Sequence, residues 1–186
     1  MIYIELIGGL GNQLFQIFSG ISYAFENNIN FKIIRTKFDK VSLLDNKSLR
    51  PTYWHNFFIN ISKFTCDNIN TLTYNEPTFT YNKIPIINKD FKIHGYFQSP
   101  KYFQNYYNSI IELIGLDKQK AEIREKYKEY FSNKVISLHF RIGDYTKKPN
   151  FHVILNTKYY IDALKFILEK DDTCDTILYF NEEQDN

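Results

Sequence analysis

The stretch IGGLGNQLFQ at residues 7–16 decides how the chain begins to fold. It follows an apolar run, residues 2–7, that reads as a β-strand. Glycine occupies three of the four positions 8–11, and apolar residues then recur at helical spacing at Leu14, Ile17, Phe18, Ile21, Ala24 and Phe25. Residues 31–35 read as a second strand. The order strand, glycine turn, helix, strand is the opening of an α/β unit.

A glycine-rich turn between a strand and a helix is well suited to bind an anion. Its backbone N–H groups are free and the helix dipole favours negative charge. Glycine also lets a ligand approach the backbone closely. The candidate binding residues are Gly8, Gly9, Gly11, Asn12 and Gln13. The alternative is a tight turn that binds nothing.

Two common phosphate-binding motifs are excluded at this turn. The dinucleotide fingerprint needs glycine where Leu14 stands, and the Gly-Lys-Ser/Thr of the P-loop is absent. Asn12 and Gln13 add directional donors and acceptors, and Asn12 is also predicted to cap the following helix.

Composition excludes several classes of protein. The chain has 186 residues, 44% of them hydrophobic and 24% charged, with a formal net charge of +2. These values are typical of a soluble globular protein of one or two domains and point to no nucleic-acid partner. Two distant cysteines and the lack of a signal peptide or a long apolar run predict a cytoplasmic protein without a transmembrane segment. Peripheral association with a membrane stays open.

A second motif, HFRIGDY at 139–145, lies where the clearest strand of the second half, 135–141, runs into a loop. Ligands bind beyond the carboxyl ends of strands in open α/β sheets. Arg141 could hold a pyrophosphate bidentately, and His139 lies on the same face of the strand. Asp144 could position that guanidinium or bind a sugar hydroxyl. The alternatives are a surface Arg–Asp pair and a core histidine.

Elsewhere the pattern is uneven. Residues 36–95 show no firm periodicity, although 54–58 are predicted to form a short helix packed inward. A strand is predicted at 91–97. The remaining predictions are helices at 103–114, 118–131 and 160–167 and a last strand at 176–180.

The chain resembles the α-1,2-fucosyltransferases, glycosyltransferase family 11. GGLGNQLFQ at 8–16 is similar to the N-terminal signature of that family, and HFRIGDY to its His-x-Arg-Arg-Gly-Asp-Tyr motif. GYFQSPKYF at 95–103 resembles its Gly-Tyr-Phe-Gln-Ser-x-Lys-Tyr-Phe segment, which makes Gln98 a candidate acceptor contact, against a packing role for this corner. Tyr159-Tyr160 with Ala163 resembles its Tyr-Tyr-x-x-Ala helix start.

The resemblance implies transfer of L-fucose from GDP-fucose to the 2-hydroxyl of a galactoside, with inversion and with no metal or other cofactor. It implies an α/β fold of the GT-B type: a Rossmann-type N-terminal lobe at 1–115 and the beginning of a second, donor-binding α/β lobe at 116–186. Arg141 would stabilise charge on the departing GDP, with His139 and Asp144 beside it. The glycine loop would lie beside the pyrophosphate and the acceptor.

Two departures from the family pattern bear on these expectations. Ile142 replaces the second Arg of the motif, which would point away from Arg141 on a strand. Family members also continue through a longer second lobe, so we expect an incomplete donor pocket unless a partner chain supplies the rest. The alternative functions are an inactive remnant and a carbohydrate- or protein-binding module on the same scaffold.

Overall fold

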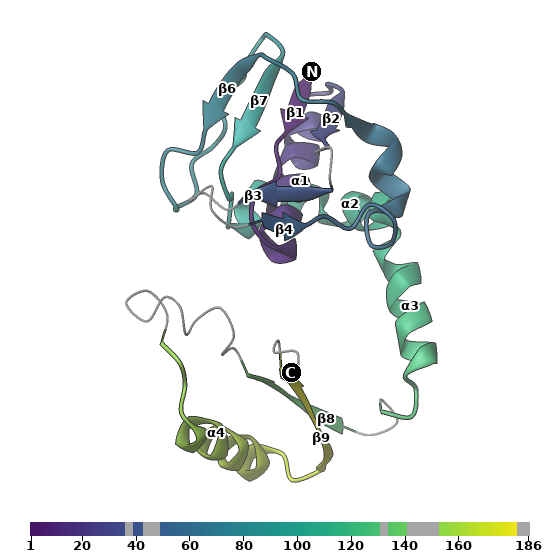
Figure 1. Cartoon of the computed structure of the whole chain (residues 1–186), viewed down its shortest axis with the longest axis vertical. Coiled ribbons are helices and arrows are strands. Elements are labelled where there is room, and N and C mark those ends of the chain that lie inside the picture. The colour runs from purple at the N-terminus through teal and green to yellow at the C-terminus, as the bar shows by residue number, and fades with distance from the viewer. Residues whose placement is uncertain (36–38, 43–48, 131–133, 141–152, 182–186) are drawn as a thin grey trace. The chain divides into compact units, whose positions relative to one another are not determined.

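The structure is a computed structural model of the chain (Figure 1). Contacts along the chain divide it into two compact units, Met1–Lys120 and Ala121–Asn186, called unit 1 and unit 2 below. The residues that it describes are 1–35, 39–42, 49–130, 134–140 and 153–181.

Unit 1 is built on a five-stranded parallel sheet with the order β5-β2-β1-β7-β6. In the central part of this sheet Ile4 pairs with Ile33 on one side and with Ile93 on the other. Apolar, β-branched residues at these positions suit a strand buried between neighbours. The strands are β1 (Ile2–Ile4), β2 (Phe31–Ile34), β5 (Thr65–Cys66), β6 (Leu72–Asn75) and β7 (Phe91–His94).

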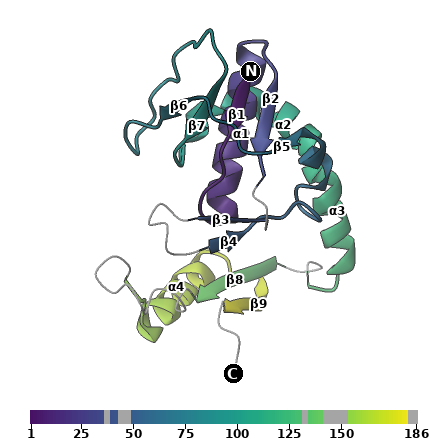
Figure 2. The same cartoon turned by 45° about the horizontal axis from the view of Figure 1, so that its top comes forward.

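Helix α1 (Leu10–Glu26) packs on one face of this sheet, beside β1 (Figure 2). Its glycine at position 20 permits the close approach, because a Cβ there would lie 2.4 Å from Cγ1 of Ile4. Ile17 and Ile21 are fully buried on the same side of the helix. The shorter helices of unit 1 are η1 (Ile59–Phe64), η2 (Pro100–Tyr102), η3 (Gln104–Tyr106) and α2 (Tyr107–Ile114).

The segment without clear periodicity contains a small antiparallel hairpin, β3 (Lys40–Ser42) and β4 (Leu49–Pro51). The helix predicted at 54–58 is wrong, because these residues form turns that lead into η1. The inward packing is confirmed: Trp54 and Phe58 are buried with their rings 5.5 Å apart.

The described residues of unit 2 include a parallel strand pair and, between these strands in the chain, a helix. Tyr160 of that helix packs on Phe140 with ring centroids 4.4 Å apart. The Asn156 side chain caps the helix by accepting a hydrogen bond from the N–H of Tyr159. The strands are β8 (Lys134–Phe140) and β9 (Cys174–Asn181), and the helix is α4 (Thr157–Lys170).

The structure confirms a mixed α/β chain with a central parallel sheet, compatible with a Rossmann-like lobe. The predicted helix 118–131 is α3 (Leu116–Lys126), which begins earlier, ends earlier and runs across the boundary between the two units. The assignment of 1–115 and 116–186 to the two lobes of a GT-B enzyme remains a prediction.

Candidate functional site

The carboxyl edge of the unit 1 sheet is where this fold can place a ligand. From β1 the chain moves through α1 to β2 on one side, whereas β7 pairs with β1 on the other side. The direction of winding therefore changes between β1 and β7. In open parallel sheets, ligands bind at such a switch point, beyond the carboxyl ends of the strands. The glycine loop follows β1 at this edge.

Two buried glutamines hold the backbone of the glycine loop. Gln16 accepts a hydrogen bond from the N–H of Ile7 at 2.9 Å and donates one to its carbonyl at 3.1 Å. Gln13 donates from Nε2 to the carbonyls of Gly8 and Pro51 at 2.9 and 2.8 Å. Both side chains are fully buried, so their amides define the loop conformation rather than contact solvent.

The three glycines of the loop have different reasons to be glycine. Gly8 has φ +78°, and a Cβ there would lie 2.5 Å from Nδ2 of Asn12, so the fold requires glycine. A Cβ on Gly9 or Gly11 would meet nothing within 4 Å in the described chain, and neither residue has a positive φ. Packing therefore gives no reason for glycine at these two positions, which leaves the backbone open to a ligand.

The prediction that Asn12 caps α1 is wrong. The helix begins at Leu10 with Gly9 as N-cap and no side-chain capping bond. Asn12 lies in the first turn, where its Oδ1 accepts a hydrogen bond from Nε2 of Gln98 at 2.7 Å. The structure thus brings two predicted binding residues into contact across 86 positions of sequence, because both follow neighbouring strands.

The carboxylate of Glu76 holds the backbone of the segment that follows β7, which lies at the carboxyl edge of the sheet next to the glycine loop. Glu76 accepts hydrogen bonds from the N–H groups of Tyr96 and Phe97 at 2.8 Å, through a single oxygen. Phe97 has φ +53° although it is fully buried, and Gly95 has φ +151°. Strained backbone of this kind persists only where its surroundings enforce it. No pattern in the sequence indicated this role of Glu76.

An ion-pair cluster lies at the ends of β1 and β7. Glu5 is 2.7 Å from Nδ1 of His94 and 3.2 Å from Nζ of Lys92. The hydrogen bond from His94 is the main reason that the pKa of Glu5 falls below its usual 4.5, because it outweighs burial, which raises the pKa. Glu5 was not predicted as a site residue, although an acid inside the apolar run IYIELI is the signal that could have identified it.

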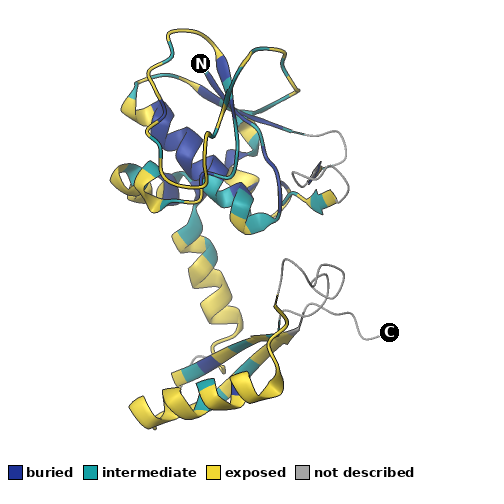
Figure 3. Cartoon of the chain, turned by 90° about the vertical axis from the view of Figure 1, so that its left-hand side faces the viewer, coloured by how far each residue is buried: buried dark blue, intermediate teal, exposed yellow. Residues whose placement is uncertain are grey.

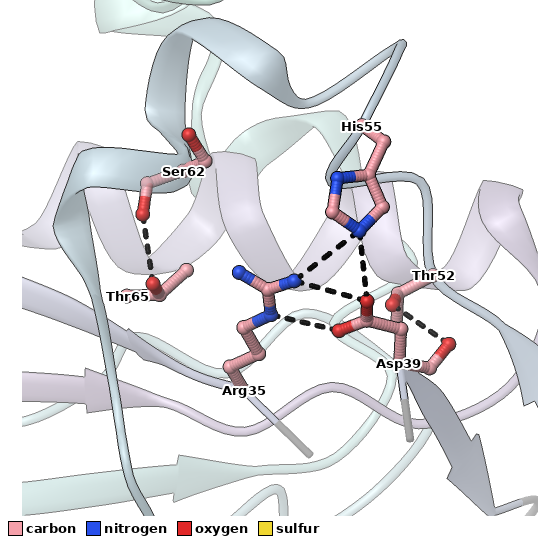
Figure 4. A network of polar contacts seen from close by, with 6 residues as sticks. All are labelled: Arg35, Asp39, Thr52, His55, Ser62 and Thr65. Atoms are coloured by element: carbon pink, nitrogen blue, oxygen red, sulfur yellow. Dashed lines mark hydrogen bonds and ion pairs between the residues drawn. The ribbon is translucent and has the colours of Figure 1, made fainter. Parts of the chain in front are cut away.

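A third polar cluster follows β2 (Figure 4). Arg35 forms a two-point ion pair with Asp39, at 2.7 Å from Nε and 2.9 Å from Nη2. His55 lies 3.2 Å from the same carboxylate, and Thr52 donates to the Asp39 carbonyl at 2.8 Å. The Arg35 hydrogen bond lowers the pKa of Asp39 below its usual 3.8. This network fixes the entry to the hairpin whose Pro51 carbonyl anchors Gln13.

The second motif belongs to unit 2. His139 lies in β8, and its carbonyl accepts a hydrogen bond from the Tyr160 hydroxyl at 3.4 Å. Arg141 and Asp144 lie outside the described residues. Their roles, like those of His139 and the glycine loop, remain predictions.

The described parts of the chain contain no cluster of metal ligands and no membrane-spanning helix. No group of three or more His, Cys, Asp or Glu side chains there could hold a metal ion. None of the helices in those parts combines the length and the apolar character needed to cross a membrane.

Comparison with known proteins gives one informative match. The chain is 21% identical over 188 aligned positions to an alpha-1,2-colitosyltransferase of Escherichia coli. The match covers 91% of this chain and 65% of that enzyme, so the chain spans about two-thirds of the length of its relative. No family model and no solved structure matches the chain. A distant relative of this protein is therefore a glycosyltransferase.

Proposed function

We propose that the chain forms the N-terminal lobe and the beginning of the second lobe of an α-1,2-fucosyltransferase with a GT-B fold. In the proposed reaction the 2-hydroxyl of a galactoside attacks the anomeric carbon of GDP-fucose with inversion. The bond from that carbon to the β-phosphate oxygen breaks, GDP leaves, and the hydroxyl proton passes to a base. Arg141 would stabilise the charge that develops on GDP.

The observation that carries this proposal is the open backbone at Gly9 and Gly11. These glycines stand at the start of α1 and at the switch point of a parallel sheet, where the helix dipole favours a phosphate. The Asn12–Gln98 hydrogen bond places two amide side chains at the same edge. Such amides suit the recognition of sugar hydroxyls, since each both donates and accepts.

The donor sugar has a second candidate. The relative is named for colitose, so a GDP-linked deoxysugar other than fucose fits the same loop. A second class of function is a carbohydrate- or protein-binding module without catalysis. Binding of the GDP-sugar donor distinguishes a glycosyltransferase from a module that binds only a glycan or a protein. Transfer of the sugar to a galactoside distinguishes an active enzyme from a protein that only binds the donor.

A thermal-shift titration with GDP, GDP-fucose and GDP-colitose tests the proposal, with the buried and only tryptophan, Trp54, as fluorescent probe. We expect a concentration-dependent rise in melting temperature, because the donor binds only the folded chain. The rise should be lost in Arg141→Ala. An absent shift with all three ligands at millimolar concentration would contradict donor binding.

A glycine substitution makes the test specific to the loop. Gly11 lies in α1, and glycine is the poorest helix former except proline, so Gly11→Leu should favour the helix. A Cβ at position 11 would meet no neighbour within 4 Å. We expect the free protein to gain about 0.5–1 kcal/mol in stability while the GDP-dependent shift disappears. Ser109→Leu, at an exposed position of α2, is the matched control and should keep the shift. If Gly11→Leu kept the full shift, the loop would not be the donor site.

A further inference from the structure

A cavity of about 250 Å³ lies in unit 1 beside the second half of α1. Ser19 and Ser22 of the helix line it, together with Tyr81, Ile84, Lys101 and Tyr102. Asn12 at the glycine loop and Ser22 at the cavity are ten residues apart on one helix. At a rise of 1.5 Å per residue they are about 15 Å apart along its axis, so the cavity is separate from the candidate donor site.

Hydrogen bonds hold the walls of the cavity in place without any ligand. The Tyr23 hydroxyl donates to the carbonyl of Pro85 at 2.9 Å and accepts from the N–H of Ile87 at 3.2 Å. The Tyr102 hydroxyl accepts from the N–H of Asn82 at 3.0 Å. Residues 82–87 are thereby tied both to α1 and to η2. A site built in this way loses little conformational entropy when a ligand binds.

A buried hydroxyl without a partner lines the cavity. Ser19 is 1% exposed, and its Oγ has no hydrogen-bond partner in the described chain. Burial of an unsatisfied hydroxyl is unfavourable, and most such groups in folded proteins are paired. Rotation of the Ser19 side chain toward the cavity that it lines would let a ligand hydroxyl supply the missing partner.

The rim carries more positive than negative charge and presents an aromatic ring. Lys83 lies 3.3 Å from the carboxylate of Glu26, and Nζ of Lys101 lies 5.9 Å from the centroid of the Tyr81 ring. Tyr81 in turn packs edge-on against Tyr102 at 4.8 Å. Two lysines and one glutamate leave a net charge of about +1 at the rim, by ordinary side-chain charges.

We propose that this cavity binds one acidic sugar unit, a hexuronate or a similar carboxylated residue of a glycan. The serines and the rim amides of Gln104 and Asn105 suit sugar hydroxyls, the tyrosine rings suit the apolar face of a sugar, and Lys101 suits the carboxylate. The volume is below the roughly 300–1,000 Å³ of sites for drug-sized ligands, which fits a single sugar unit. The site is independent of the proposed transferase function.

Ligand titration of the full chain by NMR or calorimetry, with D-glucuronate and D-glucose as probes, tests the proposal. The two sugars share a ring and differ at the carboxylate. For a ligand of this size we expect a dissociation constant of about 1 mM for glucuronate. Glucose should bind about three- to tenfold more weakly, because it lacks the charge-assisted contact at a solvent-exposed rim.

Three variants locate the binding. Lys101→Gln should remove the preference for glucuronate, whereas Lys63→Gln should leave it unchanged. Lys63 is the matched control because its ammonium also lies over a ring, that of Phe64 at 5.2 Å, away from the cavity. Ser19→Ala should weaken the binding of both sugars to a similar extent. It should leave the melting temperature of the free protein equal or higher, since it removes an unsatisfied hydroxyl.

Four outcomes would overturn the proposal. Absence of saturable binding at ten times the expected dissociation constant would exclude a sugar site, and equal affinity for both sugars would exclude the acidic specificity. Full displacement of glucuronate by equimolar inorganic phosphate would indicate a simple anion patch. Binding unaffected by both Lys101→Gln and Ser19→Ala would place it elsewhere. GDP should not compete with glucuronate, because the two proposed sites are separate. A lack of glucuronate binding would therefore leave the proposal of a GDP-sugar site unaffected.

Discussion

Units 1 and 2 both combine helices with parallel strands, yet they differ sharply in burial (Figure 3). Unit 1 buries nearly the whole inner side of α1 and the apolar residues of β1, β2 and β7. In unit 2 the buried hydrophobic residues among those described are Ile136 and Tyr160. Apolar side chains of α4 and β9 stay exposed, among them Phe166 at 62% and Tyr179 at 73%.

The difference shows that secondary structure alone does not make a core. The main sheet of unit 1 has five strands, and helices close over its apolar face. Among its described residues, unit 2 has two paired strands and one helix between them besides the end of α3, an arrangement that buries little surface. Large exposed apolar patches are typical of surfaces that pack against further protein. Four experiments test this contrast, from the largest expected effect to the smallest.

The largest effect is expected when the units are separated. A fragment of residues 1–120 should unfold cooperatively and keep Trp54 buried, because the core cluster lies within it. A fragment of residues 121–186 should show no cooperative transition, since two strands and a helix bury too little apolar surface. Circular dichroism melts of both fragments check this. A sharp melt of 121–186 would break the contrast between the units.

Loss of a buried amide should strongly destabilise unit 1. Gln16→Leu leaves the N–H and the carbonyl of Ile7 buried without their partner. We expect a loss of about 2–4 kcal/mol in the free energy of unfolding, from two unsatisfied backbone groups. Urea titration followed by Trp54 fluorescence measures it. Gln104→Leu, at an exposed position of η3, is the control and should change stability by less than about 0.5 kcal/mol.

A smaller, pH-dependent effect is expected at Glu5. Its pKa is lower in the folded chain than in the unfolded one, so the carboxylate stabilises the fold above about pH 4.5 and loses this effect as the pH falls through its folded pKa. At pH 7 the free energy of unfolding of the wild type should exceed that of Glu5→Gln by about 1 kcal/mol, and this difference should vanish in acid. Urea titrations across pH check this, with Glu112→Gln on α2 as control. A difference that persists at low pH would point to packing instead.

The smallest effect is expected at a similar ion pair in unit 2. Asp171 accepts a hydrogen bond from Nζ of Lys134 at 2.7 Å, which is the main reason that its pKa falls to about 2. Solvent surrounds this pair, so we expect Asp171→Asn to leave the melting temperature of the chain unchanged within error. A measurable drop would mean that this surface pair contributes more to unit 2 than its exposure implies.

Residue patterns predicted the regular parts of the fold well. Alternation and helical spacing identified β1, α1, β2, β7, β8, α4 and β9, because each of these elements has a continuous apolar pattern of its own. The segment 36–95 was predicted poorly. Its strands β5 and β6 are short, and each is stabilised by pairing with a strand distant in sequence.

The candidate site was predicted in part. The sequence pointed to the glycine loop and to Gln98. It could not show that the side chains of Gln13 and Gln16 are hydrogen-bonded to the loop backbone. It misassigned Asn12 as a cap, since the spacing of a motif does not fix where a helix begins. Glu76 was missed because its partners lie twenty residues away.

By itself, the sequence determined the α/β class, the order of the main elements and the glycine loop at the start of α1, because these depend on local propensity and periodicity. Only the tertiary structure decided which loops share an edge of the sheet, that Asn12 meets Gln98, and that a cavity lies beside the second half of α1. These features depend on strand order and on contacts between residues far apart in the chain. A local pattern carries no information about such contacts, because they form only when strands that are distant in sequence pair in the sheet.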